Sequence, residues 1–188
     1  MNFEAIFPTP FGKLGIRCSA QALSGIEFLP AGTRAVLPRD ALAREVCAQL
    51  GAYLRESAFQ FDLPLELNGT EYQRTVWRAL GDIPSGEVRT YGELALVLHS
   101  SPRAVGQACG NNPIPVVIPC HRVVSKAGMG GFMHRADEGA LNIKQWLLTH
   151  ETTTPSPLMG EGRGEGELCG EPPLPPAPLP QGARGAAR

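Results

Sequence analysis

The sequence lacks the features that mark membrane-embedded and secreted proteins. Its 188 residues contain no apolar run close to the roughly 20 residues that a bilayer-spanning helix needs. The first residues, Met1 to Glu4, begin neither a basic region nor the apolar run of a secretory signal. These absences predict a cytoplasmic protein that does not associate with a membrane.

Disulfide and metal-binding patterns are also missing. The five cysteines include no CxxC pair, and such a scattered, odd-numbered set predicts reduced thiols. All four histidines follow residue 98, so the N-terminal half has no Cys/His cluster for zinc. We therefore expect no metal and no cofactor.

Charge gives little indication of a partner. The net charge of the whole chain is −1, whereas residues 85–126 carry four basic and two acidic side chains, a local charge of +2. That weak basic patch is compatible with phosphate contacts but does not by itself indicate nucleic acid.

Composition divides the chain into three segments and predicts an α/β (α+β) fold. Residues 1–67 contain three strand-like runs and an amphipathic helix at residues 40–55, which predicts a small α/β unit with a structural role. An Asn-Gly boundary then opens a mostly helical unit, residues 68–152. Residues 153–188 hold 8 prolines and 7 glycines in 36 positions and are predicted to be a disordered tail.

The second unit contains a predicted helix-turn-helix. A capping box at residues 70–73 begins one helix, and a short helix is expected at residues 91–98. Ser101 then caps another helix, which continues to Gly110 and is rich in small residues. Those small residues indicate either close packing against a neighbouring element or a backbone that approaches a DNA groove.

The stretch from Pro115 to Val124 has the most unusual pattern. Its continuous β-branched residues predict a buried strand or buried extended segment that ends at Pro119, and a thiol and an imidazole follow at once as Cys120 and His121. The pattern places a nucleophile and a base side by side at the end of a buried segment.

Residue types alone leave two interpretations of Cys120 open. One is an inert buried cysteine beside a surface histidine. The other is a nucleophile with His121 as its base, although neighbours on a strand point to opposite faces. The backbone would then have to turn sharply at Cys120, or a water would have to bridge the two side chains. Glu151 is a candidate acceptor that would orient the imidazole. It ends a predicted amphipathic helix that carries Leu141, Ile143, Trp146, Leu147 and Leu148.

Three motifs carry a resemblance to a known family. They are Gly110-Asn-Asn-Pro-Ile-Pro-Val-Val-Ile-Pro-Cys-His-Arg-Val124, Arg103-Ala-Val-Gly106 and Trp146-Leu-Leu-Thr-His-Glu151. They resemble the active-site signature, the recognition helix and the end of the final helix of the O6-alkylguanine-DNA alkyltransferases. The resemblance covers about residues 70–151. It implies an N-terminal RNase H-like α/β domain and a C-terminal domain with a winged-helix-like helix-turn-helix.

The resemblance also implies a single-use repair reaction. Cys120 would attack the alkyl carbon of O6-alkylguanine, or of O4-alkylthymine, and keep the alkyl group. His121 would take the thiol proton through water while Glu151 holds the imidazole. Tyr91 would donate a proton to the departing guanine, and Asn112 would link the helix-turn-helix to the active-site strand.

Contacts with double-stranded DNA are implied at other positions. Arg103 would fill the gap that the extruded base leaves, because a damaged base is unreachable inside the stack. From residue type alone, the favoured interpretation of Arg103 is a phosphate-binding residue at a helix N-terminus. That of Tyr91 is a packed aromatic whose hydroxyl caps a turn. The other implied positions are Tyr91, Gly92, Ala104 and Gly106 for DNA contact, and Val123 and Phe132 for the base pocket. A monomer is expected.

The chain departs from the family pattern after its Gly-rich loop. Phe132 replaces the usual tyrosine, Met133 replaces a small polar residue, and the loop of residues 133–140 is longer than usual. Stacking on the base is retained, but the alkyl-group preference is expected to change. The alternative function is a non-catalytic, alkyltransferase-like protein that binds DNA damage. Such relatives lack the reactive cysteine, so Cys120 argues against it.

Overall fold

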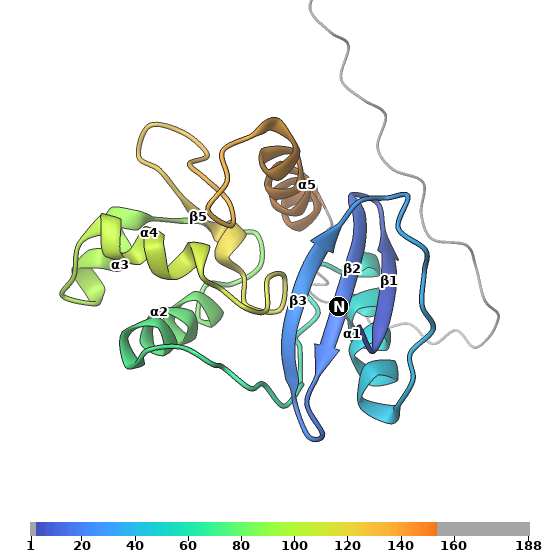
Figure 1. Cartoon of the computed structure of the whole chain (residues 1–188). Coiled ribbons are helices and arrows are strands. Elements are labelled where there is room, and N and C mark those ends of the chain that lie inside the picture. The colour runs from blue at the N-terminus through green and yellow to red at the C-terminus, as the bar shows by residue number, and fades with distance from the viewer. Residues whose placement is uncertain (1–2, 154–188) are drawn as a thin grey trace, which may run out of the picture.

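A three-stranded antiparallel sheet and one helix form the N-terminal part of the protein. The computed structural model describes residues 3–153. Its sheet has the order β1-β2-β3, and α1 packs against it (Figure 1). The elements are β1 (Ala5–Thr9), β2 (Gly12–Cys18), β3 (Leu23–Leu29) and α1 (Ala41–Arg55). The strands and the helix predicted for this segment are confirmed.

Local sequence explains where α1 begins and which face it buries. Asp40 caps the helix, since its side chain accepts a hydrogen bond from Ala43 N at 2.7 Å. Val46, Leu50 and Tyr53 follow at helical spacing and are buried against the sheet. Tyr53 is therefore held rigidly, although its hydroxyl reaches beyond this unit.

The second part of the chain is mostly helical. Its elements are α2 (Glu71–Gly81), β4 (Arg89–Thr90), α3 (Tyr91–Val97), α4 (Pro102–Gly110), the 3-10 turn η1 (Cys120–Arg122), β5 (Val123–Val124) and α5 (Glu138–Thr153). The capping box at Thr70 and the cap at Ser101 are present. Trp77 anchors α2 to α4 by donating a hydrogen bond to Ala108 O at 2.9 Å. The helix-turn-helix pair predicted from the sequence is α3 with α4.

The strand predicted for the apolar run that ends at Pro119 is wrong, although the burial predicted for that run is confirmed. The segment is largely buried, but only Val123 and Val124 form a strand, and residues 115 and 118 make an isolated bridge. Pro115 and Pro119 lack the N–H groups that a ladder needs. The Ile118 amide bonds Ile114 O at 2.9 Å, so the chain folds back on itself. It then enters η1, which supplies the sharp turn at Cys120.

The buried face of α5 also differs from the prediction. Of the apolar residues expected to define that face, only Leu147 is buried. The buried positions are Ala140, Lys144, Leu147 and Glu151, at helical spacing. Two charged side chains lie on this face because each finds several hydrogen-bond partners inside the protein.

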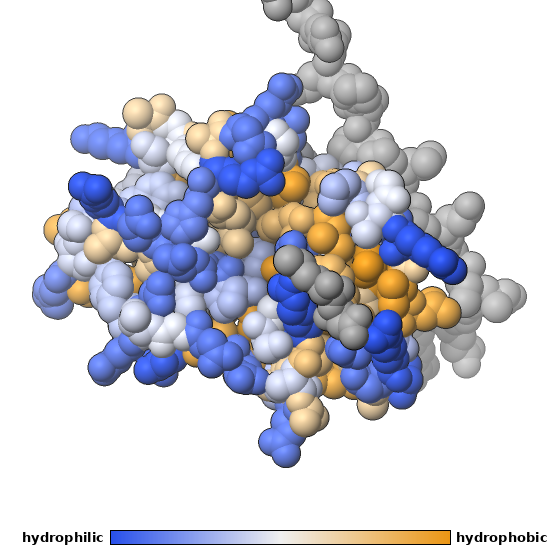
Figure 2. Space-filling model, in the orientation of Figure 1, coloured by the Kyte–Doolittle hydropathy of each residue, from blue (hydrophilic) through white to orange (hydrophobic). Residues whose placement is uncertain are grey.

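Strand β3 is the sheet edge nearest the helices of the second part (Figure 1). Ile26 N donates to Pro113 O at 2.9 Å, which ties this strand to the segment that leads toward Cys120. One hydrophobic core continues from the sheet into the helices. On the face drawn in Figure 2, hydrophobic residues gather over the sheet, and the helical side is mostly hydrophilic.

The architecture confirms the mixed α/β fold class. Within residues 3–153, no helix is long and apolar enough to cross a bilayer, and no group of three or more His, Cys, Asp or Glu side chains could hold a metal ion. The predicted tail lies outside the described residues, except for Thr153, which ends α5.

Candidate active site

Cys120 lies in a buried turn that Asn112 holds in place. Cys120 is 3% exposed and is the first residue of η1. The buried Asn112 side chain donates to Ile118 O at 2.8 Å and accepts from Ile114 N at 3.0 Å. A single amide thus satisfies two backbone groups that the missing strand would otherwise have paired.

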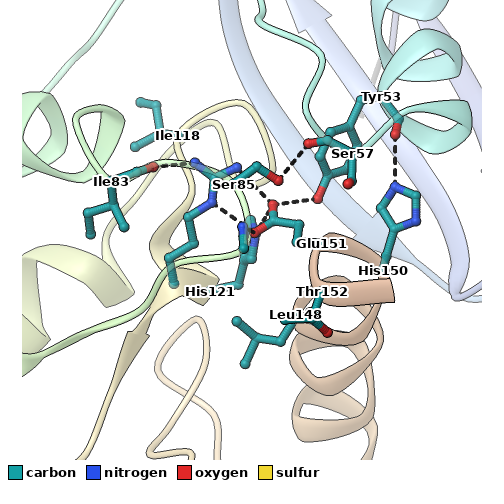
Figure 3. A network of polar contacts seen from close by, with 12 residues as sticks. Tyr53, Ser57, Ile83, Ser85, Ile118, His121, Leu148, His150, Glu151 and Thr152 are labelled. Atoms are coloured by element: carbon teal, nitrogen blue, oxygen red, sulfur yellow. Dashed lines mark hydrogen bonds and ion pairs between the residues drawn. The ribbon is translucent and has the colours of Figure 1, made fainter. Parts of the chain in front are cut away.

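His121 and Glu151 form a buried pair beside the thiol. His121 Nε2 lies 2.9 Å from Glu151 Oε1, and both side chains are almost completely shielded from solvent. Figure 3 shows Glu151 on the last turn of α5, pointing toward His121. The contact that the sequence suggested between these two residues is present.

Two further donors fix the Glu151 carboxylate. Arg122 Nε lies 2.9 Å from Oε2, and Arg122 Nη2 lies 2.8 Å from Oε1, a bidentate pair. The Tyr53 hydroxyl donates to Oε1 at 2.9 Å, and His150 Nε2 lies 2.8 Å from Tyr53 O (Figure 3). The N-terminal unit therefore contributes a side chain to this network.

The network sets the protonation state of His121. Burial would raise the pKa of Glu151, but the hydrogen bonds and charges of His121 and Arg122 lower it to about 2. Burial, together with the charges of Arg122 and Lys144, lowers the pKa of His121 against the hydrogen bond and charge of Glu151, which raise it. Since the ionised carboxylate only accepts, Nε2 of the neutral imidazole carries the hydrogen, and Nδ1 keeps a free lone pair. His121 Nδ1 is buried and has no hydrogen-bond partner among the described residues.

The thiol itself is protonated at neutral pH. Burial raises the pKa of Cys120 to about 11, against the opposing effects of the Asn112 hydrogen bond and the Lys144 charge. Cys120 borders a cavity of about 280 Å³, which is also lined by Tyr91, Gly106, Cys109, Phe132 and Met133. A ligand in this cavity meets a neutral thiol, which needs a base before it can act as a nucleophile.

Lys144 is fully buried and donates to three backbone carbonyls, one of them on the cavity-lining residue Gly131. Its ammonium donates to Val123 O at 2.6 Å, Met129 O at 2.7 Å and Gly131 O at 3.1 Å. Burial lowers its pKa to about 8, and no carboxylate pairs with it in these contacts. Lys144 therefore places a positive charge near Cys120 and ties α5 to both β5 and the Gly-rich loop.

The remaining predicted residues fall in two places. Tyr91 lines the cavity, and its hydroxyl donates to Gly131 O at 3.3 Å. Burial, and to a smaller extent the thiols of Cys109 and Cys120, raise the pKa of Tyr91 to about 12. Val123 and Phe132 are buried around the same region. Arg103 is exposed on the first turn of α4. The other positions predicted for DNA contact, namely Gly92, Ala104 and Gly106, are half-buried on α3 and α4.

Sequence reasoning missed three residues of this site: Tyr53, Arg122 and Lys144. Tyr53 lies in the unit predicted to have a structural role, and its hydrogen bond to Glu151 connects it to the site. Arg122 stands within the active-site motif, which assigns no role to it, and no motif includes Lys144. A lysine in register with Ala140 and Leu147 on one helical face was the available signal.

The fold and the site together define a class of protein. A helix-turn-helix unit carries, in one buried turn, a protonated thiol next to a neutral histidine that is oriented by a glutamate. The family model described as "6-O-methylguanine DNA methyltransferase, DNA binding domain" matches residues 71–153. The chain belongs to the methylated-DNA–protein-cysteine methyltransferase family.

Individual relatives support this membership. A methylated-DNA–protein-cysteine methyltransferase of Methanosarcina acetivorans is 36% identical over 157 residues, which are 79% of this chain and 97% of that protein. One from Mycolicibacterium paratuberculosis is 48% identical over 106 residues, 55% of this chain and 61% of that protein. A crystal structure of Mycobacterium tuberculosis OGT in complex with DNA superposes with a TM-score of 0.67 at 32% identity, covering 79% of this chain and 92% of that one.

Proposed function

We propose that this protein repairs alkylated DNA by transferring an alkyl group from the O6 atom of guanine to Cys120. The observation that carries the proposal is the buried Cys120 in one turn with His121, whose Nδ1 has no hydrogen-bond partner within residues 3–153. O4-alkylthymine has the same alkyl–oxygen bond and is a second candidate substrate. We infer that the protein acts as a monomer in the cytoplasm, on double-stranded DNA.

The reaction begins with the thiol proton. A buried nitrogen without a partner is a site for a bridging water. Through such a water, His121 Nδ1 accepts the proton of Cys120, and Glu151 stabilises the imidazolium that forms. Because Arg122 and Tyr53 already hold the carboxylate, the proton stays on the imidazole instead of moving on to Glu151.

Alkyl transfer then follows as a displacement at carbon. The Cys120 sulfur forms a bond to the alkyl carbon, and the bond between that carbon and O6 breaks. Guanine leaves with the electron pair of that bond and takes a proton from the Tyr91 hydroxyl. The proton held by the His121 imidazolium then returns to the Tyr91 oxygen. The product is a thioether on Cys120. No step regenerates the thiol, so each molecule acts once.

The helix-turn-helix presents the base to this site. A guanine inside a duplex must leave the stack before its O6 can reach a buried sulfur. Arg103, which is exposed, would fill the gap, and the small residues Gly92, Ala104 and Gly106 would let the backbone approach the DNA. Val123 and Phe132 would enclose the extruded base, and Asn112 would keep the Cys120 turn in register with α4.

Transfer of radiolabelled methyl from an O6-methylguanine duplex tests the proposal. We expect one label per protein molecule, found by peptide mapping on Cys120 and absent in Cys120→Ala. Cys109→Ala is the matched control, since Cys109 lines the same cavity but lies outside the η1 turn. Binding that persists while all label stays on the DNA would instead support a non-catalytic damage-binding protein.

A further inference from the structure

A strained turn lies over Cys120. Phe132 N donates to Arg135 O at 2.8 Å and Arg135 N donates to Phe132 O at 2.9 Å, so Met133 and His134 are the central residues of a two-residue turn. Their φ angles are 51° and 58°, in the left-handed region. Asn and Gly are preferred at such positions, and a residue with a bulky side chain loses about 1–2 kcal/mol there. Strain of this kind persists where the surrounding structure holds it, and it is often functional.

The two strained side chains reach both walls of the cavity. Met133 Sδ lies 3.9 Å from Cys120 Sγ, so the two sulfurs are in contact and no atom fits between them. The His134 ring packs on Gly110 at the end of α4, where a Cβ would come within 2.4 Å of it. Gly110 therefore admits the ring, and the ring holds the turn against α4. Both side chains border the cavity that Cys120 opens into.

We propose that Met133 limits the size of the alkyl group that Cys120 accepts. This inference rests on the proposed function. In a displacement at carbon, the sulfur approaches opposite the departing oxygen, so substituents on the reacting carbon project sideways from the line of attack. A methyl group has only hydrogens there, whereas a benzyl group places a ring beside the sulfur. The Met133 thioether occupies part of that space.

The place of Met133 in the cavity lining, beside the reacting sulfur, supports the same conclusion. About 280 Å³ must hold the guanine ring together with its alkyl group. Atoms that an alkyl group carries beyond its reacting carbon come close to the sulfur, where the Met133 side chain already lies. Misfit of one or two methylene-sized groups in an apolar pocket changes rates by roughly 10- to 200-fold.

Comparison of the transfer rates of two alkyl groups tests the inference. The rate of transfer is measured for the full chain with one duplex that carries either O6-methylguanine or O6-benzylguanine. Met133→Ala is expected to raise the benzyl-to-methyl rate ratio at least about tenfold. Met133→Leu keeps the bulk and should leave the ratio within about twofold of wild type. Met129→Ala is the second control, because Met129 precedes Met133 in the same loop but does not line the cavity. It should also leave the benzyl-to-methyl rate ratio within about twofold of wild type.

The outcomes separate this inference from the proposed function. If wild type transfers methyl but Met133→Ala leaves the ratio unchanged, Met133 does not set alkyl size and the proposed function stands. If wild type transfers neither group, the proposed function itself fails. If Met133→Ala does not fold, the order of the methyl and benzyl transfer rates in the wild-type protein still tests the inference. We expect slower transfer of benzyl than of methyl, although a benzylic carbon is intrinsically more reactive, and the opposite order would overturn the inference.

Discussion

Replacing Tyr53 with phenylalanine isolates the contribution of the N-terminal unit to the site. The change removes one oxygen, which donates to Glu151 Oε1 at 2.9 Å, and keeps the ring that packs near Phe61 and His150. A hydrogen bond to a charged group contributes about 1.5–3 kcal/mol to the free energy of unfolding. At a urea dependence of about 2 kcal/mol/M, Tyr53→Phe should lower the urea midpoint by roughly 1 M.

Tyr72→Phe is the matched control for this substitution. Its hydroxyl lies 2.7 Å from Ser100 Oγ, so it pairs with a neutral group in a partly buried position. Neutral hydrogen bonds contribute about 1 kcal/mol. Unfolding of both variants in urea, followed by circular dichroism, gives the comparison. A midpoint loss for Tyr53→Phe no larger than that for Tyr72→Phe would refute the placement of Tyr53 on an ionised carboxylate.

The pH dependence of alkyl transfer distinguishes positioning from mere stability. His121 must be neutral to accept the thiol proton, and its folded pKa is lowered, so transfer should slow only at pH values below that pKa. Without the Tyr53 hydrogen bond, the Glu151 carboxylate attracts a proton on His121 more strongly, which raises the pKa of His121. The acidic limb of the rate profile should therefore move to higher pH in Tyr53→Phe. An unmoved limb in a folded variant would show that Tyr53 has no influence on the histidine.

Other substitutions test the remaining contacts. Glu151→Gln removes the negative charge that pairs with Arg122 and should lower the free energy of unfolding by about 3–5 kcal/mol at pH 7. The pKa of Glu151 falls from 4.5 to about 2 on folding. The difference in free energy of unfolding between wild type and Glu151→Gln is therefore complete above pH 4.5 and should shrink toward pH 2 in urea titrations. Lys144→Met removes the donor to three carbonyls, of which Val123 O is buried, and should lower the free energy of unfolding by about 2 kcal/mol in thermal denaturation. The same change at the exposed Lys126 should lower it by under about 0.5 kcal/mol. Arg103→Ala should slow repair of a duplex about tenfold, with little effect on the free alkylated base; equal effects on both substrates would exclude a role in base extrusion.

Local signals in the sequence were sufficient for most of the helices. The capping residues Thr70 and Ser101 begin helices where they were expected, because a side-chain cap needs only its nearest backbone amides. The strand expected before Cys120 failed for the complementary reason. Its apolar residues correctly predicted burial, but a strand also needs a partner, and Pro115 and Pro119 cannot donate to one.

The family motif located the thiol and its histidine, but not the network that holds them. The positions of Cys120 and His121 follow from adjacent residues in one motif. Tyr53 and Lys144 could not be found in this way. They reach the site through contacts separated by 98 residues for Tyr53 to Glu151 and 21 residues for Lys144 to Val123. No local pattern reports such pairs.

The sequence by itself determined the helices, the buried character of the segment before Cys120, and the identity of the thiol. Each depends on neighbouring residues along the chain. Only the tertiary structure decided the turn at Cys120, the neutral state of His121, and the closeness of Met133 to the sulfur. Protonation of His121 depends on burial and on charges brought from α5 and η1. The space beside the sulfur depends on how the loop that carries Met133 packs against it. Those quantities exist only once the chain has folded.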